Sequence, residues 1–179
     1  MLQDIREVLI SKEAIEAKTN ELAERISRDY KGKDLLVVGV LKGSVIFASE
    51  LIKNITIPCE IDFMAVSSYG SSSETTGVVR ILKDLDSEIS RKHILIVEDI
   101  VDSGVTLSYL LNYLKTRNAS SVEIASLLTK PSRRKVDIDC KYVGFETPDE
   151  FLVGYGLDYA EKYRNLPFIG ILKREVYEK

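Results

Sequence analysis

Short apolar runs alternate with helical patterns along most of the chain. Continuous runs rich in β-branched residues, such as residues 35–41, are typical of strands buried on both faces. Apolar residues that recur every three or four positions predict helices. The predicted strands span residues 35–41, 59–66, 78–82, 93–100, 122–129 and 141–145, and the predicted helices span residues 11–30, 42–54 and 104–116. This alternation predicts an α/β fold in which a parallel twisted sheet is flanked by helices.

Two segments fall outside this alternation. Residues 67–77 are small and polar and contain glycine, so they predict a loop. Without a functional role, this loop would be a flexible hairpin tip. Residues 146–179 have an irregular pattern with one further apolar stretch, FIGIL. There are no repeats or low-complexity linkers, and 179 residues suit one domain with a full-sized core. We therefore expect a single domain over residues 1–179.

Composition and charge narrow the classes of function. A net charge of -3 and a pI near 5.4 argue against a broad nucleic-acid interface. No apolar run approaches the roughly 18 residues of a membrane span, and the N-terminus lacks the layout of a signal peptide. We therefore expect a cytoplasmic protein with no membrane or nucleic-acid partner. Cys59 and Cys140 form no metal-binding motif, and His93 is the single histidine, so acid–base chemistry falls to Asp, Glu or Lys.

Polar residues gather where the predicted parallel strands end. Ligands of such sheets bind beyond the carboxyl ends of the strands. Three segments lie there: residues 41–43, residues 98–106 and Lys130. A candidate site is expected where they meet.

The segment from Asp102 to Thr106 opens a predicted helix. One interpretation is helix capping, with Asp102 or Ser103 as the cap and Gly104 supplying an unusual backbone angle. The other is a phosphate site, because free N–H groups at a helix start, a glycine and two hydroxyls suit an anion. The spacing of a Walker A loop and of a dinucleotide fingerprint is absent, so a phosphate ester is the better candidate.

Glu98 and Asp99 stand side by side before this segment. They could simply be residues at a strand end, paired with lysines. Next to a bound phosphate, however, two carboxylates need Mg²⁺ or sugar hydroxyls to offset the repulsion. Together, the two features predict a phosphorylated sugar bound with magnesium.

These residues resemble a known family. VEDIVDSGVTL, residues 97–107, is similar to the phosphoribosyl-pyrophosphate signature of type I phosphoribosyltransferases. Further stretches resemble the hypoxanthine-guanine branch and occur in the right order: GVLKGS at 39–44, SSYG at 67–70, LLTKPSRR at 127–134 and VGFETPDEFLVGYGLDYAEKYRNLP at 143–167. The resemblance covers essentially the whole chain and implies the type I phosphoribosyltransferase fold, with a small irregular hood formed by the C-terminal segment.

The resemblance also implies a role for each matched residue. The implied catalytic base is Asp102, which takes a proton from the purine. The implied Mg²⁺ ligands are Glu98, Asp99 and Asp158. Phosphoribosyl contacts are implied for Glu98, Asp99, Asp102, Ser103, Gly104, Val105 and Thr106. Pyrophosphate contacts are implied for Lys42, Gly43, Arg164 and Arg133, with a non-proline cis peptide at Leu41-Lys42. Purine contacts are implied for Lys130, Phe151, Leu152 and Asp158.

A lid is implied as well. Ser68 and Tyr69 match positions that close over pyrophosphate in the family, so residues 67–77 are expected to form a mobile lid loop. Two departures appear: Leu152 stands where valine is common, and Thr129 stands where many bacterial members carry Asp.

The implied reaction belongs to purine salvage. Phosphoribosyl pyrophosphate would donate its phosphoribosyl group to N9 of hypoxanthine or guanine, with Mg²⁺ as cofactor and a homodimer or homotetramer as the assembly. Two rival hypotheses remain. A signalling receiver domain also has an acidic pocket at strand ends, but its acidic pair belongs after the first strand. A phosphoribosyltransferase-like regulator that binds nucleic acid would need an added segment or a basic face.

Overall fold

The computed structural model describes residues 1–68 and 79–178. Elements follow the order β1 (Ile5–Ile10), α1 (Lys12–Asp29), β2 (Leu35–Leu41), α2 (Val45–Asn54), β3 (Glu60–Ser68), β4 (Val79–Lys83), β5 (His93–Val101), α3 (Val105–Lys115), β6 (Ser121–Thr129), β7 (Tyr142–Glu146), β8 (Leu152–Val153), β9 (Ile169–Leu172) and α4 (Arg174–Tyr177). Short 3-10 turns cover Leu2–Asp4 and Pro131–Arg133.

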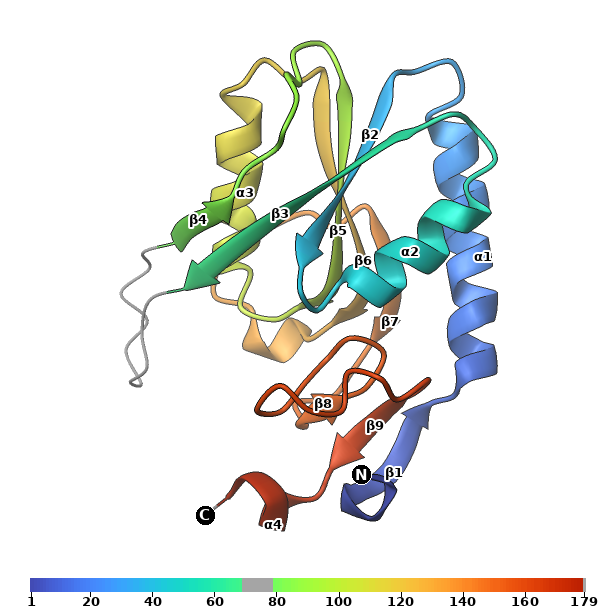
Figure 1. Cartoon of the computed structure of the whole chain (residues 1–179), viewed down its shortest axis with the longest axis vertical. Helices are drawn as coiled ribbons and strands as arrows, with labels where there is room; N and C mark the ends of the chain where they lie inside the picture. Colours follow the sequence, from blue (N-terminus) through green and yellow to red (C-terminus); the bar gives the residue numbers. More distant parts are fainter. Residues whose placement is uncertain (69–78, 179) are drawn as a thin grey trace.

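The main sheet has six strands in the order β4-β3-β2-β5-β6-β7 (Figure 1). The pairs β2–β3, β2–β5, β5–β6 and β6–β7 are parallel, as the buried apolar runs predict. The edge strand β4 pairs with β3 antiparallel, so the prediction of a parallel sheet is wrong for this strand. A short connection from β3 to β4 explains the difference, because a parallel pair needs a crossover of a dozen or more residues.

Helices cover both faces of this sheet (Figure 1). Val37 of β2 faces the cluster that α1 and α2 cover, whereas its neighbours Leu36 and Val38 face the cluster of α3. Strands in this position need apolar side chains at every residue, which is why β2, β5 and β6 appear as continuous apolar runs.

Helix boundaries follow local capping. Ser11 caps α1 as predicted: its hydroxyl accepts a hydrogen bond from the backbone N–H of Ala14 at 3.2 Å. Helix α2 begins at Val45, so the prediction that it starts at Lys42 is wrong. The residues between β2 and α2 form a turn instead, and this turn lies at the carboxyl end of the sheet.

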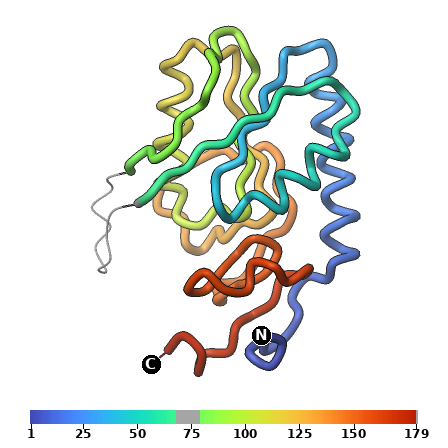
Figure 2. Tube along the Cα trace, viewed as in Figure 1, coloured from blue at the N-terminus to red at the C-terminus, as the bar shows by residue number. Residues whose placement is uncertain are grey.

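The hood is a separate three-stranded sheet in the order β1-β9-β8. Both neighbouring pairs are antiparallel, and Ile5 of β1 pairs with Leu172 of β9. The two ends of the chain therefore lie side by side in the hood (Figure 2). The expectation of an irregular, purely C-terminal hood is wrong in these respects. The physical reason is that β1 pairs with β9 at the other end of the chain, and a pairing between such distant segments leaves no local pattern in the sequence.

Residues 67–77 were predicted to form a loop and a lid. Ser67 and Ser68 instead end β3 and pair with Arg80 and Val79 of β4. Tyr69 and the rest of the predicted lid lie outside the described residues. None of the described helices has the length and apolarity needed to cross a membrane.

Candidate active site

The described segments that carry the predicted site residues lie where β2, β5 and β6 end and where the hood faces the sheet (Figure 1). The turn after β2 carries Lys42 and Gly43, β5 carries Glu98 and Asp99, and Lys130 directly follows β6. The predicted non-proline cis peptide at Leu41-Lys42 is confirmed.

Two glycines allow the turn after β2 to sit between β5 and the hood. A Cβ on Gly43 would lie 1.9 Å from Oδ2 of Asp99, and a Cβ on Gly156 would lie 1.9 Å from the carbonyl oxygen of Gly43. Neither position has room for a larger residue. The backbone at Gly43 is thus in contact with the acidic strand end on one side and with the hood on the other.

Glu98 and Asp99 are carboxylates without a cation partner in the described part of the chain. Burial, followed by the neighbouring charge of Asp99, raises the pKa of Glu98 well above its usual value. Burial also raises the pKa of Asp99 to about 6, although a backbone N–H and the nearby Arg164 oppose this shift. Expected lysine pairing does not occur here, which disfavours the purely structural interpretation. A cation or hydroxyl ligand would stabilise the charged forms of both groups.

The segment after β5 forms an open loop at the start of α3. Gly104 is the N-cap with φ of 83° and has no side chain to cap the helix. Oγ of Ser103 accepts a hydrogen bond from the N–H of Val105, the first residue of α3, at 3.4 Å. The capping interpretation therefore holds in part for Ser103, whereas Asp102 makes no such bond. The loop is held from outside, because the backbone N–H groups of Lys135 and Val136 donate to the carbonyl oxygen of Ser103 at 2.9 and 3.3 Å. The other backbone N–H groups in the first turn of α3 remain available to an anion.

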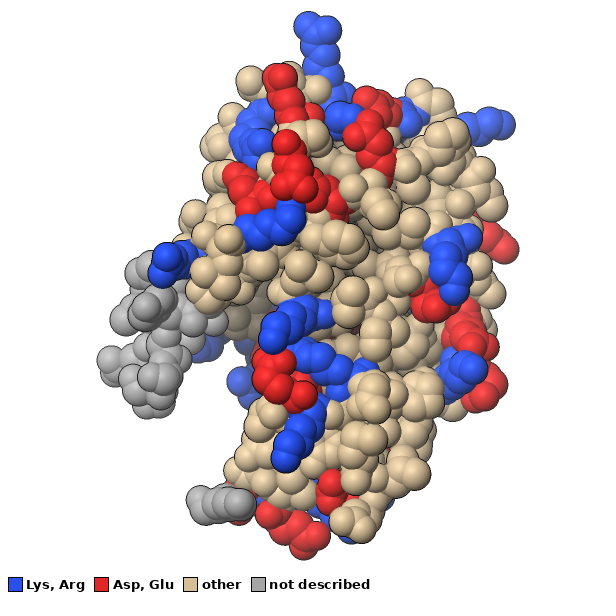
Figure 3. Space-filling model, viewed as in Figure 1, with Lys and Arg blue, Asp and Glu red and all other residues tan. Residues whose placement is uncertain are grey.

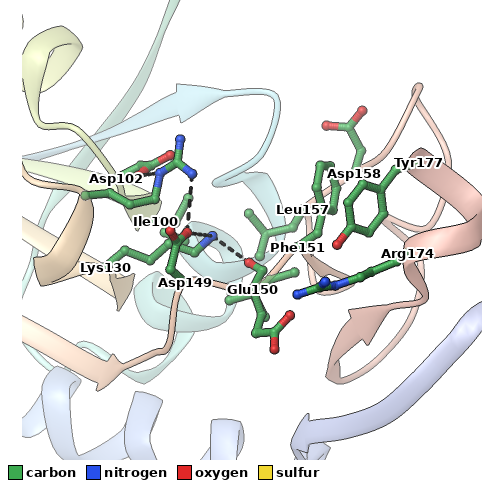
Figure 4. Close-up of a pocket in the computed structure, with 12 residues that line it drawn as sticks. Ile100, Asp102, Lys130, Asp149, Glu150, Phe151, Leu157, Asp158, Arg174 and Tyr177 are labelled. Carbon is green, nitrogen blue, oxygen red and sulfur yellow. Dashed lines mark hydrogen bonds and ion pairs between the residues drawn. The ribbon is translucent and has the colours of Figure 1, made fainter. Parts of the chain in front are cut away.

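Asp102 belongs to a chain of charged groups (Figure 4). Nε of Arg133 lies 2.8 Å from Oδ1 of Asp102, and NH1 of the same arginine lies 3.3 Å from Oδ1 of Asp149. Both partners of Arg133 border the same pocket. The residue predicted to be a general base is therefore held, in this state, by an arginine that was predicted to contact pyrophosphate.

Lys130 is a buried lysine whose amino group faces the pocket. Its Nζ donates to the carbonyl oxygen of Glu150 at 2.7 Å and lies 4.0 Å from Oδ1 of Asp149 (Figure 4). Burial lowers the pKa of Lys130, although nearby acids including Asp102 oppose the shift. A lysine that merely ended a strand would project into solvent. Lys130 instead offers directed N–H donors inside the pocket.

Phe151 contributes an aromatic wall. Its ring stacks on Tyr177 with centroids 4.8 Å apart and meets the edge of Tyr159 at 5.5 Å. The pocket between sheet and hood is lined by Ile100, Asp102, Lys130, Arg133, Asp149, Glu150, Phe151, Leu152, Leu157, Asp158, Arg174 and Tyr177 (Figure 4). Of these, Ile100, Asp149, Glu150, Leu157, Arg174 and Tyr177 were not predicted. The sequence did carry signals for four of them: Ile100 directly follows the acidic pair, and Asp149, Glu150 and Leu157 lie within the matched stretch 143–167.

A second group of charges lies on the hood. NH2 of Arg164 pairs with Oδ1 of Asp158 at 2.9 Å, and its NH1 donates to the carbonyl oxygen of Gly156 at 2.7 Å. Lys42 pairs with Glu161 at 3.0 Å. Basic and acidic side chains gather together on the face where the hood meets the sheet (Figure 3). Two of the three cations predicted for pyrophosphate, Lys42 and Arg164, thus lie in one charged cluster, whereas the third, Arg133, pairs with Asp102 and Asp149.

The acids fit a magnesium ion that a substrate helps to bind. The described residues contain no group of three acidic, histidine or cysteine side chains arranged for a metal. Mg²⁺ rarely needs such a group, since it keeps several waters and binds through one or two carboxylates plus substrate phosphates. The raised pKa values of Glu98 and Asp99 indicate carboxylates that a nearby cation would stabilise.

Comparisons with known proteins define the class first. The family model described as the phosphoribosyl transferase domain matches residues 8–160. The hypoxanthine-guanine phosphoribosyltransferase of Bacillus subtilis is 54% identical over 99% of this chain and 99% of its own length. That of Streptococcus mutans is 53% identical over 99% of this chain and 98% of its own length. A crystal structure of a hypoxanthine phosphoribosyltransferase from Staphylococcus aureus superimposes with a TM-score of 0.97 and 53% identity, covering 100% of this chain and 97% of that one.

This chain belongs to the phosphoribosyltransferase family, in the branch of the hypoxanthine-guanine phosphoribosyltransferases. The resemblance stated from the sequence and the expected type I fold are confirmed. The match also decides against the receiver domain as the class of protein.

Proposed function

We propose that this chain transfers the 5-phosphoribosyl group from phosphoribosyl pyrophosphate to N9 of hypoxanthine or guanine. The bond from the ribose C1 to pyrophosphate breaks, a bond from C1 to the purine nitrogen forms, and pyrophosphate leaves. The observation that carries the proposal is the meeting of Asp102 and Lys130 in one pocket, beside the start of α3. These are a proton acceptor, a donor for an oxo group and a phosphate site.

Asp102 is proposed as the general base. Its carboxylate borders the pocket and takes the N7 proton of the purine as N9 attacks, which makes the base a better nucleophile. The ion pair with Arg133 at 2.8 Å orients this carboxylate before the purine binds.

Lys130, Phe151 and Leu152 are proposed to bind the purine. The amino group of Lys130 donates to the 6-oxo group, the ring of Phe151 stacks on the base, and Leu152 contributes backbone contacts. Support comes from the position of all three around one pocket. Since Lys130 can only donate, it selects a purine with an acceptor at this position.

The phosphoribosyl group is proposed to lie across the strand ends. Ser103, Gly104, Val105 and Thr106 hold the 5′-phosphate through backbone N–H groups and hydroxyls. Glu98 and Asp99 accept hydrogen bonds from the ribose hydroxyls. The start of α3 supports the first assignment, because among the described residues only the N–H of Val105 meets a side-chain acceptor there, Oγ of Ser103 at 3.4 Å.

Pyrophosphate is proposed to bind to Lys42, Gly43 and Arg164, with Arg133 reaching it when released from Asp102. Positive charge at these positions stabilises the charge that grows on the leaving group. Glu98, Asp99 and Asp158 would hold Mg²⁺, which when bound neutralises part of the charge on pyrophosphate. The assignment of Asp158 is supported by its position beside a cation proposed to bind pyrophosphate, because its Oδ1 lies 2.9 Å from NH2 of Arg164.

Four further parts of the proposal remain. Assembly into a homodimer or homotetramer and a lid over the site that includes Ser68 and Tyr69 rest on the family resemblance. A cytoplasmic location and one domain over residues 1–179 rest on the composition and length of the chain.

The test is an assay for nucleotide formation. Purified protein is incubated with phosphoribosyl pyrophosphate, Mg²⁺ and either hypoxanthine or guanine, and nucleotide and pyrophosphate are quantified together. We expect equal amounts of the two products with at least one of these bases. Hydrolysis of the donor without nucleotide, or no reaction with either base, would contradict the proposal.

A further inference from the structure

Glu161 connects Lys42 and Arg164, two of the three cations that the proposed function assigns to pyrophosphate. Its Oε2 accepts a hydrogen bond from Nζ of Lys42 at 3.0 Å, and its Oε1 accepts one from NH2 of Arg164 at 3.4 Å. Each carboxylate oxygen thus faces a different cation. Lys42 comes from the turn after β2, whereas Arg164 and Glu161 lie in the segment that connects β8 and β9 of the hood. The pair with Lys42 is the first cause of a lowered pKa of Glu161.

The backbone around Glu161 has an uncommon conformation. Ala160 and Glu161 are consecutive non-glycine residues with positive φ angles of 50° and 63°. Such residues are rare and persist where surrounding contacts hold them. Here the N–H of Glu161 donates to Oδ2 of Asp158 at 2.8 Å. The backbone conformation of this loop therefore directs the Glu161 carboxylate toward the two cations.

In the proposed reaction, the leaving pyrophosphate is likewise an anion that binds between this lysine and this arginine. We propose that Glu161 stands in for oxygens of the leaving group while the site is empty, and that it competes with pyrophosphate for Lys42 and Arg164. The inference deepens the proposed function and rests on it. Glu161 has no assigned role in that reaction, and it acts through the two cations without touching the reacting atoms.

Two consequences follow from this competition. On entry, phosphoribosyl pyrophosphate must displace the carboxylate, which weakens its binding. On exit, the same carboxylate can return to the cations and favours release of pyrophosphate. A merely structural bridge between hood and sheet would have the opposite effect on affinity, because its loss would loosen the site.

The magnitude is set by solvent exposure. The side chains of Lys42 and Glu161 are 68% and 64% exposed, so their attraction is strongly screened by water. Ion pairs that are this exposed change binding constants by small factors only. Removing the competitor should therefore tighten pyrophosphate binding by about two- to five-fold.

Three variants test the inference. Glu161→Gln keeps the size of the side chain but removes its charge. Glu161→Asp keeps the charge but is one methylene shorter, so it cannot reach both cations. The matched control is Glu21→Gln, which removes the same charge from an exposed pair with Lys18 at 2.6 Å on α1. Thermal melting of each variant verifies folding.

The measurements are the Kd of pyrophosphate by titration calorimetry in MgCl2 and the KM for phosphoribosyl pyrophosphate with hypoxanthine. We expect Glu161→Gln to lower both constants about two- to five-fold, Glu161→Asp to lower them less, and Glu21→Gln to leave them unchanged. Unchanged or raised constants in Glu161→Gln would overturn the inference, as would an effect equal to that of Glu21→Gln. Wild-type affinity in Glu161→Asp would overturn the bridging part. A wild-type protein that forms no nucleotide would instead overturn the proposed function.

Discussion

Gly156 offers a test of how tightly the hood must fit against the sheet. It has φ of 104°, and a Cβ at this position would lie 1.9 Å from the carbonyl oxygen of Gly43. Its own backbone is fixed, since its N–H donates to the carbonyl oxygen of Arg164 at 3.0 Å and its carbonyl oxygen accepts from NH1 of Arg164. Gly156→Ala therefore has to move either the hood or the turn that carries Lys42.

The cost has two parts. A side chain in a left-handed backbone conformation costs about 1–2 kcal/mol, and forcing an extra methyl into packed backbone costs about 1–3 kcal/mol more. A substitution at Gly32 distinguishes these two costs. Gly32 has φ of 76°, but a Cβ there meets nothing within 4 Å. Gly32→Ala should thus carry only the first cost, and the difference between the variants, about 1–3 kcal/mol, measures the close approach.

Two measurements follow the two consequences. Urea denaturation gives the loss in the free energy of unfolding, which should be larger for Gly156→Ala than for Gly32→Ala by that difference. Steady-state kinetics should show a KM for phosphoribosyl pyrophosphate raised about ten-fold or more in Gly156→Ala alone, as misplacement by about 1 Å costs even more in well-ordered sites. Equal destabilisation by both substitutions, with an unchanged KM in Gly156→Ala, would refute the reasoning.

Further predictions concern the chemistry. Removing Mg²⁺ with excess chelator should abolish turnover, because pyrophosphate leaves poorly without charge neutralisation; full activity in chelator would contradict this. Asp102→Asn should lower kcat by roughly 10²–10⁴, which is the usual contribution of a general base, and should change the KM for phosphoribosyl pyrophosphate little. A near-wild-type kcat would show that Asp102 is not the base. Adenine should be used up to about 10⁴–10⁵-fold less efficiently than hypoxanthine, because its 6-amino group meets the donor of Lys130; a comparable kcat/KM for both bases would refute the assignment of Lys130.

The sequence predicted the main sheet well where burial on both faces left a continuous apolar run. β2 has the predicted bounds, and β5 and β6 differ by one residue at one end. The hood was harder to predict. Half of β1 is exposed, and its register shifts twice along β9, so neither alternation nor an apolar run marks it. Its pairing with β9 depends on a contact between the two ends of the chain.

The candidate site shows the same division. Parallel strands that end at one edge bring Lys42, Asp99 and Lys130 together, so these could be predicted from strand ends and family motifs. The pairing of Arg133 with Asp102 and the bridge made by Glu161 could not. Both depend on side chains that meet only after the hood and the loop after β6 are folded, and charged residues in such loops look like solvated surface in the sequence.

The most direct test of the account is a crystal structure of the protein with Mg²⁺, phosphoribosyl pyrophosphate and an unreactive hypoxanthine analogue. The account predicts the 6-oxo group within hydrogen-bond distance of Nζ of Lys130, the purine N7 facing Asp102 and the 5′-phosphate at the start of α3. A purine bound elsewhere, or a 5′-phosphate that makes no contact with residues 103–106, would contradict it.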